Sequence, residues 1–174
     1  EIQRDMARLA DPRILSPEEA ETLIQAHPAA TWLSYGVHGN EISSPEAAMA
    51  TAYHLIASLD DAMVKTAMRE TVIIINPVQN PDGRDRFVHH FESASGIVAD
   101  ANMGSAEHDE PWPQGRTNHY LFDLNRDWFA QTQPETQAHA KAYLQWMPVA
   151  FVDAHEMGTD STYFFAPEAD PFNP

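Results

Sequence analysis

The chain has 174 residues, 43% of them apolar, and a formal charge of −16 at pH 7. This length fits a single domain with its own core, and no apolar run approaches the ~20 residues of a membrane-spanning helix. The acidic balance argues against nucleic-acid and anionic-membrane partners, which require a basic surface, and is typical of a solvated acidic exterior. Because cysteine is absent, any metal must be held by histidines and carboxylates.

The first half of the chain alternates predicted helices and strands. Ser16-Pro17-Glu18-Glu19 is a capping box with proline at the first helical position, and it predicts a helix that stops at His27-Pro28. A strand over Thr31 to Val37 follows, and a second helix starts near Ser43 and Ser44. The inward apolar face of this second helix is expected to consist of Met49, Ala52, Tyr53, Ile56 and Leu59.

Further helices and strands extend the same alternation. A short helix from about Asp61 to Arg69 precedes a strand over Thr71 to Ile75, which is apolar on both faces as central strands are. A capping box, Thr132 to Glu135, predicts a helix through about Met147, and Val149 to Ala154 reads as another buried strand. Thr162 to Phe165 resembles one more strand. The alternation predicts an α/β fold with helices on both faces of a largely parallel sheet.

The segment from Asn76 to about Gln131 shows turn signals but little periodicity, and it is expected to be a long loop. Loops of this length in compact domains are usually functional. Four of the eight arginines of this acidic chain lie there, which suggests that the segment handles an anion. The alternative is that some of them neutralise nearby carboxylates. The four arginines are Arg84, Arg86, Arg116 and Arg126.

His38 and Glu41 come just after one predicted strand, and His155 comes directly after another. Ligands collect at the carboxyl edge of strands in open α/β sheets. Two histidines and one glutamate form a known catalytic zinc set that leaves a fourth position for water. The H-x-x-E pattern is weak evidence by itself, but its place at a strand end favours a metal site made of these three residues.

The other histidines are expected to be solvent-exposed or packing residues. His27 and His54 lie on predicted helices, and His139 lies on the helix that follows Thr132, where it is expected to be solvated. A second metal site in the long segment is conceivable, but no ligand spacing supports one. The histidines of that segment are His89, His90, His108 and His119.

Four motifs in this order resemble the zinc carboxypeptidases of the carboxypeptidase A type. They span residues 38 to 155, about two thirds of the chain, and the third is the most specific. The resemblance implies a three-layer αβα fold with a mixed, largely parallel sheet. The motifs are His38-Gly39-Asn40-Glu41, Asn80-Pro81-Asp82-Gly83, Asp123-Leu124-Asn125-Arg126-Asp127-Trp128 and Val152-Asp153-Ala154-His155.

The resemblance also implies roles for individual residues. His38, Glu41 and His155 would bind Zn²⁺, and Asn125 with Arg126 would hold the free C-terminal carboxylate of a peptide substrate. A guanidinium matches a carboxylate in bidentate fashion, although Arg126 could instead pair with a neighbouring aspartate. Those aspartates are Asp123 and Asp127.

Two supporting roles follow from the same resemblance. Asp123 would support the zinc-bound His38, with Asp153 as a rival that could instead make sheet contacts. Arg116 would stabilise the oxyanion, with Arg84 and Arg86 as fallback candidates. Arg116 lies nine positions before Asn125. This interval is shorter than in carboxypeptidase A and is similar to that in the aspartoacylase and succinylglutamate desuccinylase branch.

One departure concerns the general base. The family's glutamate lies on a late strand beyond the last zinc ligand, and no acidic residue after His155 matches it; Glu156 should face away from the metal. We therefore expect residues 1–174 to be the N-terminal portion of a longer catalytic domain, with an incomplete sheet. Such a piece should bind zinc but turn substrate over slowly.

Three functions remain open from the sequence. The first is zinc-dependent hydrolysis of a C-terminal peptide bond. The second is deacylation of N-acyl amino acids, as in aspartoacylase, and the third is a non-catalytic binding domain that keeps the fold. The compartment is undecided, although export to the periplasm or out of the cell is favoured because many bacterial relatives are exported.

Overall fold

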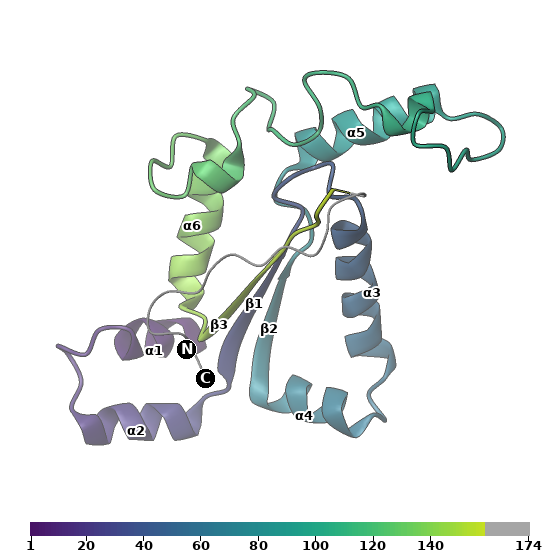
Figure 1. The fold of residues 1–174 in the computed structure, drawn as a ribbon. Coiled ribbons are helices and arrows are strands. Elements are labelled where there is room, and N and C mark those ends of the chain that lie inside the picture. The colour runs from purple at the N-terminus through teal and green to yellow at the C-terminus, as the bar shows by residue number, and fades with distance from the viewer. Residues whose placement is uncertain (159–174) are drawn as a thin grey trace, which may run out of the picture.

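The protein is built in three layers around a parallel sheet (Figure 1). The computed structural model describes residues 1–158. Its sheet consists of β1 (Ala29–Tyr35), β2 (Thr71–Asn76) and β3 (Ala150–Ala154), in the order β2-β1-β3, and both pairs of neighbours are parallel. The predicted α/β class with an incomplete sheet is confirmed.

Helices cover both faces of this sheet (Figure 1). One side carries α1 (Ile2–Leu9), α2 (Pro17–Ala26) and α6 (Pro134–Trp146), and the other carries α3 (Ser43–Ala57) and α4 (Ala62–Glu70). The capping box of α2 forms as predicted, because Ser16 Oγ accepts from the Glu19 amide and the Glu19 carboxylate accepts from the Ser16 amide. No helix of the described residues is long and apolar enough to cross a membrane.

The strand expected to be central lies at one end of the described sheet. β1 occupies the middle, and its register pairs Ala29 with Thr71 on one side and Thr31 with Ala150 on the other. Every residue of β2 is half-buried, and most of β3 is exposed. The prediction of two buried strands here was wrong, because in the described part each has a hydrogen-bonded neighbour on only one side.

The apolar face predicted for α3 points away from the core. Met49, Tyr53 and Ile56 are all exposed, while Ser44, Pro45 and Ala48 are buried. Small residues allow the start of this helix to approach the strands closely. The periodicity therefore predicted the helix correctly, but the prediction of which helix face packs against the sheet was wrong.

The long segment after β2, predicted to be a loop from its turn signals, contains a helix. α5 (Pro81–Ala94) begins at Asn80, whose side-chain oxygen accepts from the Gly83 amide. Asn80-Pro81 therefore acts as a helix cap and first helical residue, not as a turn. The rest of the segment is irregular apart from the short 3₁₀ helices η1 (Ala106–His108) and η2 (Leu124–Arg126).

The start of α6 also differs from the prediction. Its N-cap is Gln133, and no side-chain capping bond of the expected box forms. The buried carboxylate of Asp127 instead accepts from the amides of Thr132 and Gln133. The strand predicted over Thr162 to Phe165 lies outside the described residues.

Candidate metal centre

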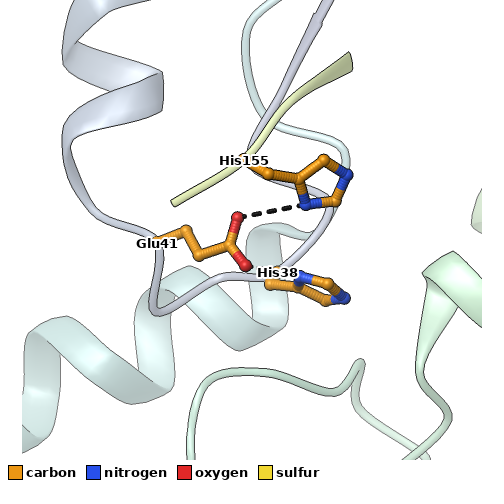
Figure 2. A group of neighbouring side chains, drawn as sticks. All are labelled: His38, Glu41 and His155. Atoms are coloured by element: carbon orange, nitrogen blue, oxygen red, sulfur yellow. Dashed lines mark hydrogen bonds and ion pairs between the residues drawn. The ribbon is translucent and has the colours of Figure 1, made fainter. Parts of the chain in front are cut away.

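Three side chains from two separate loops meet at the carboxyl edge of the sheet (Figure 2). His38 and Glu41 lie between β1 and α3, and His155 directly follows β3. One ligand atom from each of the three lies within 4.8 Å of the other two. The rings of His38 and His155 have centroids 5.2 Å apart. The structure thus brings together residues that are 117 positions apart in the sequence.

The Glu41 carboxylate bridges the two imidazoles. Its Oε1 lies 2.6 Å from His38 Nδ1, and its Oε2 lies 3.3 Å from His155 Nδ1. The Glu156 amide donates to the same Oε2 at 2.9 Å. Both Nδ1 atoms therefore face a common carboxylate, and together they form the ligand side of the cluster.

The opposite nitrogen of each imidazole contacts its own aspartate. His38 Nε2 lies 3.1 Å from Asp123 Oδ1, and His155 Nε2 lies 2.9 Å from Asp153 Oδ2. Gln79, which follows β2, donates to the other oxygen of Asp153 at 3.1 Å. A carboxylate partner of this kind fixes the ring orientation and makes the imidazole a better metal ligand.

The close contacts within the cluster shift the pKa values of Glu41 and His155. Burial by itself would raise the pKa of Glu41, but hydrogen bonds from His155, His38 and the Glu156 amide outweigh it and lower the pKa to about 2. Hydrogen bonds to Asp153 and Glu41 raise the pKa of His155 to about 10. These contacts therefore favour the anionic form of Glu41 and the protonated form of His155.

This donor set fits a zinc ion. Zinc accepts imidazole nitrogen and carboxylate oxygen at about 2.0–2.2 Å, and catalytic sites use three protein ligands with one open position. Two Nδ1 atoms and one carboxylate oxygen converge here, with the second nitrogen of each ring already paired. A second acidic group, Glu1, Asp5 and His27, fits less well, because Asp5 already pairs with Arg4 and Arg8.

Arg116 lies beside this cluster. Its Nε and Nη2 contact Asp123 Oδ2 at 3.0 and 2.9 Å, and its Nη1 lies 3.5 Å from His38 Nδ1. The fallback arginines lie elsewhere, since Arg84 pairs with Glu46 and Arg86 donates to backbone carbonyls. Of the three candidates, only Arg116 contacts a residue of the metal cluster in the described part of the chain.

Asn125 and Arg126 belong to η2, next to Asp123. The Asn125 amide donates to Asp123 Oδ1, the same atom that faces His38. Within residues 1–158, Arg126 forms no ion pair, and its Nη1 donates to the Asn125 carbonyl. The alternative that Arg126 pairs with Asp123 or Asp127 is wrong, because Arg116 and the start of α6 engage those carboxylates.

The expectation for Glu156 agrees with the geometry. Its carboxylate accepts from the amides of Ser43 and Ser44 at the start of α3, and within residues 1–158 it contacts neither histidine of the cluster. Sequence reasoning missed Gln79 as the partner of Asp153, although Gln79 follows a strand as the ligands do. It also placed His139 in solvent, whereas that ring is buried against Trp32 and Trp128.

Fold and site together define an α/β protein with a candidate mononuclear metal centre at the carboxyl edge of a parallel sheet. A family model described as zinc carboxypeptidase matches residues 15–171. The chain belongs to this family, and so to a class of zinc-dependent hydrolases that act on peptides. No curated protein matches the chain.

Proposed function

We propose that this protein is a zinc-dependent carboxypeptidase that hydrolyses the C-terminal bond of a peptide at the centre formed by His38, Glu41 and His155. The observation that carries the proposal is the convergence of these three ligand atoms within 4.8 Å. The aspartates behind both imidazoles, Asp123 and Asp153, add support because a structural histidine cluster does not require them.

The remaining residues have complementary roles in this proposal. A bound zinc ion would supply a Lewis acid and a water whose pKa falls to about 7. Arg116, beside His38, would donate to the carbonyl oxygen as negative charge grows on it, a contribution of about 3–4 kcal/mol for one well-placed donor. Asn125 and Arg126 would hold the substrate carboxylate, so that the terminal bond reaches the metal.

The attacking water also needs a general base to accept its proton, and a carboxylate is one group that can do so. Within residues 1–158, the carboxylates closest to the ligands are engaged: Asp123 by Arg116, Asp153 by Gln79, and Glu156 by the start of α3. We propose that the acceptor comes from outside these residues.

The test combines metal content with product analysis. The chain is saturated with zinc, dialysed, and incubated with a peptide, its C-terminally amidated twin, and an N-acyl amino acid. We expect one zinc per chain and loss of the last residue from the free acid only, with the products identified by mass spectrometry. Absence of bound zinc would favour a non-catalytic domain, and faster cleavage of the N-acyl amino acid would favour a deacylase.

A further inference from the structure

The side chain of Asn125 is held in one orientation by a tryptophan. Trp128 Nε1 donates to Asn125 Oδ1 at 3.2 Å, and both residues are half-buried. An indole N–H can only donate, so the amide oxygen and not the NH₂ group must face it. The NH₂ group then points away from the indole, and no hydrogen bond within residues 1–158 engages it.

The indole is itself fixed by a buried histidine. The rings of Trp128 and His139 meet edge to face, with centroids 4.8 Å apart. His139 Nδ1 lies 3.0 Å from Asn76 Nδ2 of β2, and its Nε2 lies 3.5 Å from Ser34 Oγ of β1. Burial lowers the pKa of His139, although Asp153 opposes this, so the ring is a neutral spacer between sheet and indole.

We propose that Trp128 is a positioning residue for substrate binding: its indole N–H holds the Asn125 amide with the oxygen inward and the NH₂ group outward, where it donates to the substrate carboxylate. This inference rests on the proposed function, which assigns the carboxylate to Asn125 and Arg126. An asparagine offers a donor and an acceptor on the same group. With the opposite orientation it would present an oxygen to an anion and weaken binding.

The test uses Trp128→Phe, a variant that keeps an aromatic ring at this position and removes the indole N–H. Its matched control is Trp32→Phe, because Trp32 also packs on His139, at 5.2 Å, and donates its own N–H to Ser34 Oγ, but it does not contact Asn125. The probes are a non-hydrolysable peptide analogue that ends in a free carboxylate and the same analogue ending in a carboxamide. Binding to the zinc-loaded protein is measured by calorimetry.

The quantity of interest is the ratio of the two affinities, acid over amide. Trp128→Phe is expected to weaken binding of the acid by about three- to tenfold and to leave the amide unchanged. Trp32→Phe should leave the ratio unchanged. In an Asn125→Ala background, adding Trp128→Phe should have no further effect on the ratio, because Trp128 acts only through Asn125.

The outcomes separate this inference from the proposed function. If the unaltered protein binds acid and amide equally, the proposed carboxylate site fails, and this inference fails with it. If the unaltered protein prefers the acid and Trp128→Phe keeps that preference, only this inference is overturned. It is also overturned if Trp32→Phe loses the preference equally, since ring packing and not the N–H would then be responsible.

A second variant covers the case in which Trp128→Phe does not fold. In Asn125→Asp the inner oxygen still accepts from the indole, while an outward oxygen replaces the NH₂ group. Binding of the acid should fall more than about tenfold, and binding of the amide should change little. Unchanged binding of the acid by this variant would overturn the inference.

Discussion

Replacing Asp153 with asparagine should weaken zinc binding without removing a ligand. Asp153 Oδ2 accepts from His155 Nε2 at 2.9 Å, and its Oδ1 accepts from Gln79 Nε2 at 3.1 Å. Both neighbours are donors, so a carboxylate with two acceptor oxygens satisfies both. An amide has one acceptor and one donor group, and one of the two neighbours must then face an NH₂ group.

The magnitude follows from that mismatch. Loss of a partner behind a metal-bound histidine typically costs 10- to 100-fold in metal affinity, which corresponds to about 1.4–2.7 kcal/mol. We expect Asp153→Asn to lower zinc affinity within this range. Competition with a chromophoric chelator at fixed pH and ionic strength measures it.

The control is Asp60→Asn, which removes the same charge at an exposed position after α3. It should change zinc affinity by less than about twofold, since screening weakens a distant surface charge. If Asp153→Asn binds zinc as tightly as the control, then Asp153 does not support His155 as a ligand. Loss of zinc in both variants would instead indicate a long-range charge effect.

Two further predictions concern stability and substrate binding. Asp127 is buried, which by itself would raise its pKa, but hydrogen bonds from Thr132 and Gln133 lower the pKa to about 2. Since the unfolded value is about 3.9, this carboxylate stabilises the fold above about pH 4, and that contribution is lost as the pH falls towards 2. Asp127→Asn should cost about 1–2 kcal/mol in urea unfolding at neutral pH and less in acid, and an equal loss at both would contradict the reasoning. Arg126→Lys should weaken binding of carboxylate-ended analogues by about tenfold and spare their amides, because an ammonium cannot make the bidentate contact; Arg69→Lys, at an exposed pair with Glu70, is the control.

Local signals in the sequence predicted several elements well. The capping box at Ser16 and the apolar run at Thr71 each mark one element through contacts within a few residues. The same local reading failed at Asn80-Pro81, because asparagine and proline serve equally as turn residues and as the cap and first residue of a helix. It also failed for α3, where periodicity identifies a face but not the side on which the sheet lies.

The sequence by itself determined which side chains can act as metal ligands and that they follow strands. Parallel pairing in the order β2-β1-β3 decided that the ends of those strands adjoin, and so brought His155 to His38 and Glu41. Only the tertiary structure could assign Asp153 to His155, Arg116 to Asp123, and Trp128 to Asn125. These pairings depend on the directions of the side chains, which spacing along the chain does not fix, and hydrogen bonds form only at short range.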